Sequence, residues 1–289
     1  MIKKCIICGK NKDENNFNIE HIIPEALGNK TLKIDSVCIQ CNSKLGSKID
    51  RYITECFIVK LIRNHYRIAG KSNKVPNPFK EGIDENGDKI RLDENFKPTI
   101  VSNAKQEGNL YKIKASSKKE AIEIVEKLFK KNKINMEQKE KIIEQVEIAK
   151  IESSKPKITY HYEINFDEMQ LAIIKIAYEY TYLKLGKSYY YDDCAKELRR
   201  VLQEALENNK IQRCNLINCI SEEIEEPIKC LVKEFNNSHF IQMQRVGSNI
   251  VLFISLFCTA TLSYIITVSH NVSKYEKANF TNIVKINKS

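Results

Sequence analysis

The sequence begins without an apolar run of signal-peptide length and without a small-residue cleavage site. Internal repeats and low-complexity tracts are also missing, so nothing indicates a repeat architecture. The missing signal peptide favours an intracellular protein, and we expect a cytoplasmic one. In that compartment, closely spaced cysteines are more often metal ligands than disulfide partners.

Long hydrophobic stretches are nearly absent too, because only residues 249–269 reach the length of a membrane span. Six serines and threonines interrupt this run, which is also dense in β-branched and aromatic residues. That composition favours two buried strands over one lipid-facing helix. We therefore expect no membrane contact, although a membrane-anchored effector stays an alternative.

The composition of the 289 residues, with 42% hydrophobic and 29% charged side chains, is ordinary for a globular protein of about two domains. A formal net charge of +10 suggests an anionic partner, of which nucleic acid is the simplest. The alternative is that a chain rich in Lys, Ile and Asn merely reflects an AT-rich genome.

Two CxxC pairs, Cys5 with Cys8 and Cys38 with Cys41, have the spacing of a tetrahedral structural zinc site. Four thiolates would close the coordination of the metal, so this ion would not be catalytic. The alternative is a pair of reduced or redox-active dithiols. The scattered cysteines are interpreted as buried thiols: Cys56, Cys194, Cys214, Cys219, Cys230 and Cys258.

The residues between the two pairs indicate a strand, a loop, a second strand and a helix. "FNIEHIIPEALG" reads as a short strand ending at Glu20 and His21, followed by a loop marked by Pro24 and Gly28. "KIDSV" returns as the second strand, and "NSKLGSKIDRYI" can begin a helix at Asn42. The order places Glu20, His21 and Asn42 near one end of the hairpin.

With "CIICG", "EHIIPEALG" and "VCIQCNSKLG" in this order, the segment resembles the zinc-stabilised HNH endonucleases of ββα-metal fold. The resemblance covers roughly the first fifty residues and implies an endonuclease that hydrolyses DNA, with RNA not excluded. It implies His21 as the general base and Glu20 and Asn42 as ligands of a catalytic Mg²⁺ or Mn²⁺. Bacterial defence against phage is a setting that the resemblance also suggests.

The chemistry of these side chains agrees with those roles. A neutral histidine can take a proton from water, and carboxylate and amide oxygens suit a hard cation. Adjacent strand residues point to opposite faces, so Glu20 and His21 can share a site only if the strand ends or twists there. The alternatives are a structural His21 bonded to a backbone carbonyl and an Asn42 that caps the helix. A zinc-stabilised nucleic-acid-binding or regulatory module with an inactive HNH site is the rival interpretation.

Several further residues are candidates for support of this site. The family's middle residue, which orients the histidine, has no clear counterpart, and Asp35 or Ser36 stands closest. Asp50 could add a carboxylate, or could be an exposed helical acid. Contacts with the nucleic-acid backbone are expected from basic residues that could equally form a solvated helix face: Lys44, Lys48, Lys60, Arg63 and Arg67.

Downstream patterns predict an α+β chain of three segments: the HNH module over 1–55, a basic helix and β-hairpin connector over 56–115, and an α+β accessory domain over 116–289. One helix from the first module should reach about Ala69, and Asn86-Gly87 should turn a hairpin. Further predictions are a helix capped by Ser116 or Ser117, a strand over 159–166, a helix ended by Gly186, a helix capped by Asp193 and a strand-rich end.

The accessory domain carries no chemical motif. We expect it to bind DNA, to sense a trigger ligand or to mediate homo-oligomer formation. The tyrosines of "YYYDD" at 189–193 could stack on bases, although such side chains more often pack in a core.

Overall fold

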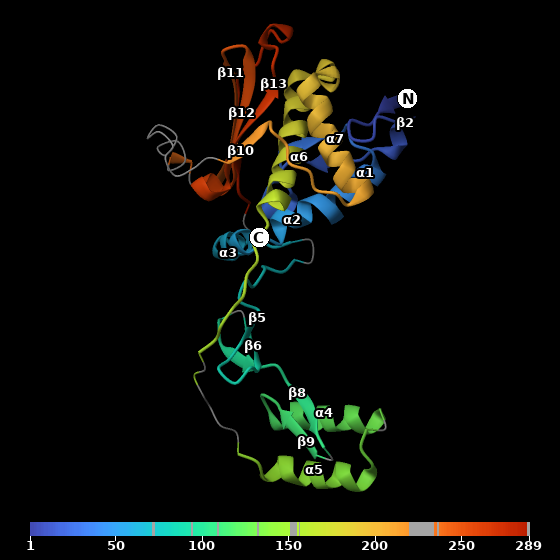
Figure 1. Ribbon diagram of the computed structural model, residues 1–289, viewed down its shortest axis with the longest axis vertical. Helices are drawn as coiled ribbons and strands as arrows, with labels where there is room; N and C mark the ends of the chain where they lie inside the picture. Colours follow the sequence, from blue (N-terminus) through green and yellow to red (C-terminus); the bar gives the residue numbers. More distant parts are fainter. Residues whose placement is uncertain are drawn as a thin grey trace. The chain divides into compact units, whose positions relative to one another are not determined.

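The computed structural model describes residues 1–70, 73–93, 95–108, 110–131, 133–150, 155, 157–219, 234–235 and 237–287. These residues form two compact units (Figure 1). The first joins Met1–Pro76 to Ile164–Ser289, and the second is Asn77–Glu163. This division differs from the three predicted segments because the C-terminal region packs on the first module. Cys230 lies outside the described residues.

The N-terminal module of the first unit has the predicted order of strand, loop, strand and helix. A hairpin of β1 (Ile2–Lys4) and β2 (Asn11–Asp13) carries the first cysteine pair at its turn. β3 (Glu20–His21) pairs antiparallel with β4 (Lys33–Ile34), and α1 (Ile39–Lys44) follows the second strand.

The helix prediction for the next residues was only partly right. The chain continues from α1 through a π-helical stretch (Leu45–Ile49) into α2 (Asp50–Thr54), but does not reach Ala69 as one helix. Cys56 is extended, with a ψ of 136°, and separates α2 from α3 (Phe57–His65). Arg67 has a φ of 57°, in the left-handed region, just after α3.

Two helices open the C-terminal part of the first unit. α6 (Phe166–Leu185) is capped by Asn165 and ends at Gly186, as predicted, where φ is 77°. α7 (Asp193–Asn208) is capped by Asp192 rather than by the predicted Asp193, because the side chain of Asp192 accepts from Cys194 N.

An antiparallel sheet of five strands completes this unit, in the order β10 (Ile217–Cys219), β13 (Ser263–Ser269), β12 (Asn249–Ser255), β11 (Ser238–Val246) and β14 (Phe280–Lys285). β12 and β13 come from the apolar run 249–269 and confirm the prediction of two buried strands. No helix among the described residues combines the length and apolarity needed to cross a bilayer.

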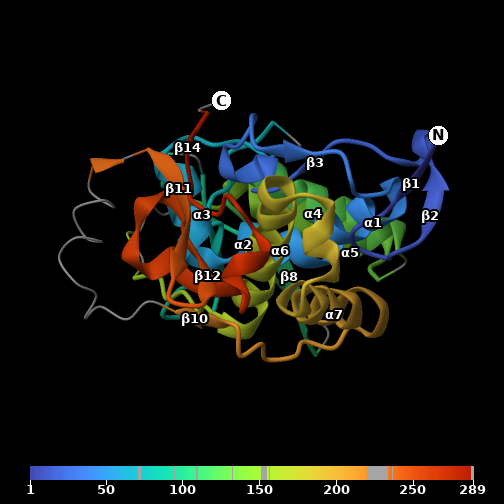
Figure 2. The same cartoon turned by 90° about the horizontal axis from the view of Figure 1, so that it is seen from above.

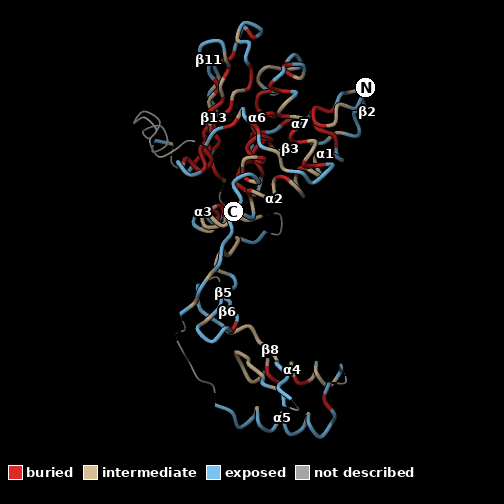
Figure 3. The backbone as a smooth tube through the Cα atoms, viewed as in Figure 1, coloured by how far each residue is buried: buried red, intermediate tan, exposed pale blue. Residues whose placement is uncertain are grey.

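α6 lies between this sheet and the N-terminal module (Figure 2). It contacts α7, α2, β13 and β12, and twelve of its residues are buried. Buried residues of the module and of the C-terminal region form one hydrophobic core (Figure 3). Two hydrogen bonds join them at the first cysteine pair: Tyr178 Oη donates to Ile6 O at 2.7 Å, and Gln203 Nε2 donates to Ile7 O at 2.7 Å.

The second unit contains two small sheets and two helices: β5 (Glu81–Ile83), β6 (Lys89–Leu92) and β7 (Pro98–Ile100); β8 (Asn103–Glu107) and β9 (Leu110–Lys114); α4 (Lys118–Lys130) and α5 (Met136–Ile148). The chain turns a hairpin at Asn86-Gly87 and Ser117 caps α4, as predicted, but Asn86 lacks the positive φ of a type I′ turn. The strand predicted over 159–166 is wrong. Only Thr159 forms a bridge, to Ile83 at the end of the three-residue β5. With helices and strands in both units, the chain is α+β, as expected.

Candidate active site

The four N-terminal cysteines lie together as one cluster. The sulfur atoms of Cys5, Cys8, Cys38 and Cys41 all fall within 4.8 Å of one another, and only Cys8 is more than slightly exposed. The turn between β1 and β2 supplies the first pair, while Cys38 is the N-cap of α1 and Cys41 lies in its first turn. Four sulfurs at this separation can surround one tetrahedral metal ion.

The electrostatics of the cluster favour a cation at its centre. A hydrogen bond from the Cys41 thiol lowers the pKa of Cys5 to about 4, although burial opposes this. The same interaction raises the pKa of Cys41, and burial raises that of Cys8. The hydrogen bond between Cys5 and Cys41 therefore favours the thiolate of the first and disfavours that of the second. The donor set fits Zn²⁺, whose charge stabilises several thiolates at once.

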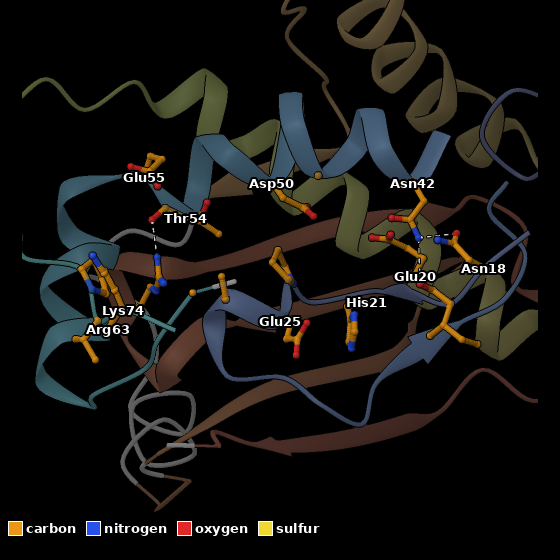
Figure 4. A pocket seen from close by; sticks show the side chains of 17 residues that line it. Asn18, Glu20, His21, Glu25, Asn42, Asp50, Thr54, Glu55, Arg63 and Lys74 are labelled. Atoms are coloured by element: carbon orange, nitrogen blue, oxygen red, sulfur yellow. Dashed lines mark hydrogen bonds between the residues drawn. The ribbon is translucent and has the colours of Figure 1, made fainter. Parts of the chain in front are cut away.

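Next to this cluster, a pocket of about 690 Å³ opens between the β3 hairpin and the helices α1 to α3 (Figure 4). Glu20, His21, Asn42 and Asp50 all line it. β3 consists of only Glu20 and His21. Because the strand ends at these residues, their side chains are not held on opposite faces of a sheet, and both can line the pocket. The three residues identified from the sequence thus share one pocket, together with Asp50.

Asn42 is held in a defined orientation. It lies inside α1 and is not the N-cap, because Cys38 takes that position. Its Nδ2 donates to Asn18 Oδ1 and to Ile19 O, both at 3.0 Å. Since the amide nitrogen is bound on that side, the carboxamide oxygen is turned toward the pocket beside Glu20 (Figure 4).

The loop after His21 is fixed by a buried asparagine that sequence reasoning missed. Asn29 is fully buried, and its Nδ2 donates to Ile23 O at 2.7 Å and to Leu32 O at 2.9 Å. Its Oδ1 accepts from the backbone nitrogens of Thr31 and Leu32. One side chain thereby closes the loop between β3 and β4. The only available signal was "GN", a common turn pair.

The C-terminal sheet holds the same loop from the other side. Buried His239 lies 2.9 Å from Leu27 O through Nε2, and its Nδ1 accepts from Phe257 N at 3.1 Å. Gly28 has a φ of 91°, and its carbonyl accepts from Asn287 N at 2.9 Å. A Cβ at Gly28 would approach Ile286 to 2.8 Å, so glycine is required there.

A lysine from α6 reaches beneath β3 and contacts the acids of the site. Lys175 is fully buried, and its Nζ lies 2.5 Å from Glu20 Oε1, 3.3 Å from Asp50 Oδ1 and 3.4 Å from Glu179 Oε2. The same ammonium donates to His21 O at 2.8 Å. Sequence reasoning missed Lys175 because a lysine in a helix, 154 residues away from His21, carries no local signal.

The charges in this buried group depend on one another. Burial alone would lower the pKa of Lys175, but Asp50, Glu179 and Glu20 together raise it, so the ammonium stays charged. Burial raises the pKa of Glu179 well above its ordinary value. One oxygen of Glu20, Oε1, is thus bound by the Lys175 ammonium.

The candidates for the middle residue lie elsewhere. Asp35 is exposed and forms an ion pair with Lys3 at 2.8 Å, which lowers the pKa of Asp35. Ser36 is buried and donates to Asp35 at 3.1 Å. The described lining of the pocket around His21 includes neither residue.

The predicted backbone-binding residues differ in their surroundings. Lys48 donates to Leu206 O at 2.7 Å and to Asn209 Oδ1 at 2.8 Å, and these bonds cap the C-terminal end of α7. Lys60 forms an ion pair with Glu55 at 2.6 Å. Half-buried Lys44 and exposed Arg67 are outside the described lining of the pocket. Arg63 alone of the five lines it.

Comparison with known families agrees with this geometry. Residues 5–58 match the HNH endonuclease family model. The N-terminal module is therefore an HNH module, and its family segment spans the thiol cluster, the β3 hairpin and the helices α1 and α2. Searches of curated proteins and of solved structures gave no match.

Proposed function

We propose that this protein is a metal-dependent endonuclease that hydrolyses phosphodiester bonds in DNA, with His21 as the general base. The observation that carries the proposal is that Glu20, His21 and Asn42 line one pocket and all belong to the segment that matches the HNH family. RNA, which has the same phosphodiester linkage, is the alternative substrate.

The chain's own residues would act as follows. His21 takes a proton from the water that attacks phosphorus, which is worth about 10²- to 10⁴-fold in rate for a well-placed base. Glu20 and Asn42 would hold Mg²⁺ or Mn²⁺ through oxygen atoms. When bound, such an ion supplies positive charge to the phosphate oxygens of the transition state. The contact of Lys175 with His21 O fixes the backbone that carries the base.

The test is incubation of supercoiled plasmid with purified protein in Mg²⁺, Mn²⁺ or EDTA, beside His21→Ala with its zinc content measured. We expect metal-dependent nicking or linearisation that the variant loses while it keeps zinc. A parallel incubation uses single-stranded RNA. If the wild-type protein cuts neither the plasmid nor the RNA in either metal, nuclease activity of the isolated protein is refuted.

An inactive nucleic-acid-binding module is the second candidate. It is favoured by the ion pair that engages Glu20 with Lys175 and by the absence of Asp35 and Ser36 from the described pocket lining. Binding of DNA that weakens with salt, without cleavage in any metal, would support it. A role in bacterial defence against phage would extend the first proposal. A plaque assay that compares cells expressing the wild-type protein with cells expressing His21→Ala would test it.

A further inference from the structure

The pocket has a second chemical end, formed by residues outside the HNH triad (Figure 4). Glu20, His21 and Asn42 lie at one end, whereas Arg63 from α3 and Lys74 lie at the other, with Asp50 between them. A volume of about 690 Å³ is within the usual range for ligand pockets, so it has room for more than one reacting phosphate.

Arg63 is the unusual residue at this end, because its guanidinium is buried and the charge of Glu55 acts on it only from beyond ion-pair distance. The residue is only 4% exposed, and Nη1 donates to Thr54 O at 3.2 Å. Its Nε has no hydrogen-bond partner in the described part of the chain, and no described carboxylate forms an ion pair with it. A buried cation in this state is costly unless an anion completes its hydrogen bonds.

Arg63 nevertheless lines the pocket, and Gly70 lines it beside the guanidinium. A Cβ at Gly70 would approach Nη2 to 3.2 Å, so a larger residue there would crowd the guanidinium. Lys74 adds a second, exposed cation. Glu55 also lines this end, but Lys60 at 2.6 Å offsets its charge.

We propose that Arg63 and Lys74 form a subsite that binds a second phosphate of the nucleic-acid backbone, next to the phosphate attacked at His21. This inference rests on the proposed function and specifies which part of the substrate the pocket holds. The planar fork of arginine suits bidentate binding of phosphate, while lysine contributes a point charge.

The experiment measures binding of a fluorescein-labelled DNA duplex by fluorescence anisotropy over a range of salt concentrations. It uses the full chain in a His21→Ala background, so that cleavage does not interfere. We expect Arg63→Gln to weaken binding about equally for duplexes of different sequence and to reduce the slope of log K against log salt by about 1. Lys74→Gln should reduce the slope by a similar amount.

The matched control is Arg51→Gln, which removes one charge from an exposed position on α2 outside the described pocket lining. It should leave the slope unchanged. If Arg63→Gln binds like the control, the subsite is refuted. If Arg63→Gln fails to fold, two other variants test the subsite. An unchanged slope in Lys74→Gln would contradict the proposal. A reduced slope in Arg63→Lys, which keeps the charge, would contradict it as well.

Kinetics separate this inference from the proposed function. With cleavage-competent protein, Arg63→Gln should raise KM for DNA about tenfold with kcat nearly unchanged, because Arg63 contributes to binding rather than to proton transfer. A protein that cuts no DNA but keeps the salt-slope effect would refute the nuclease and leave the phosphate subsite intact. A protein that cuts DNA, but whose salt slope is unchanged by Arg63→Gln and Lys74→Gln, would refute the phosphate subsite and leave the nuclease intact.

Discussion

Two polar clusters stabilise the HNH module, and they differ in which parts of the chain supply their residues. The thiol cluster takes all its members from residues 5–41 of the module itself. The carboxylate cluster takes Glu20 and Asp50 from the module, but its cation, Lys175, and its third acid, Glu179, come from α6. The first cluster is therefore local and the second is formed only when the whole first unit folds.

The largest expected effect comes from the local cluster. Removal of zinc by a chelator, or Cys41→Ala, should unfold the module, because structural zinc contributes on the order of 10 kcal/mol to such small folds. Thermal unfolding and metal content measure the outcome. Cys214→Ala removes a buried thiol outside the cluster and should keep the zinc. Full stability after zinc is lost would contradict the role given to the cluster.

The long-range cluster should give the next largest effect. Lys175→Met leaves Glu20, Asp50 and Glu179 without their cation, and breaking a buried ion pair in this way costs about 3–5 kcal/mol. Urea denaturation measures the loss. If the variant stays within about 1 kcal/mol of the wild-type protein, α6 does not stabilise the site through this ammonium.

A third buried contact between module and sheet predicts a pH effect. Burial lowers the pKa of His239 from its ordinary 6.5 to about 4, although the hydrogen bond with Leu27 O opposes this. The unfolded chain binds the proton more readily, so stability falls as pH drops below about 6.5 and the loss is complete below about 4.

That loss should amount to about 3 kcal/mol by linkage, since each tenfold difference in proton affinity between the folded and unfolded chain is worth about 1.4 kcal/mol. Denaturant unfolding of the wild-type protein and of His239→Gln at several pH values measures it. A variant whose stability shows the same dependence between pH 6.5 and 4 as the wild-type protein would exclude His239 as the source.

The smallest effect on stability is expected at an exposed ion pair, which serves as the comparison for the buried Lys175. Lys141 and Glu137 form an ion pair at 2.7 Å with the same i, i+4 spacing as Lys175 and Glu179, but their side chains are 68% and 73% exposed. Lys141→Met should change stability by about 0.5 kcal/mol or less, because exposed pairs are screened by water. A loss comparable to that of Lys175→Met would show that burial does not explain the difference.

The same contrast explains what could be predicted from the sequence. Cys5, Cys8, Cys38 and Cys41 occur in two short motifs, so their spacing already predicts the cluster. Glu20, His21 and Asn42 are fixed by a hairpin and a helix of the module, which local patterns also predict. The two strands within 249–269 followed from composition.

Interactions between distant segments could not be predicted in this way. Lys175 reads as an ordinary helical lysine, and only the packing of α6 against β3 shows that it is buried. Lys48 was interpreted as a phosphate contact, although the end of α7 binds it. Asp35 and Ser36 were chosen by their position in the sequence, whereas the loop they follow is closed by Asn29.

The hydrogen bonds from Tyr178 and Gln203 to the turn that carries the first cysteine pair have an evolutionary consequence. Recombination that exchanged residues 5–58 for another HNH module would leave both donors without their acceptors and would mismatch a shared core. The family segment is thus a unit of sequence, but we expect that it does not exchange independently of α6 and α7. Where the HNH module of such a chain varies, α6 and α7 should vary with it.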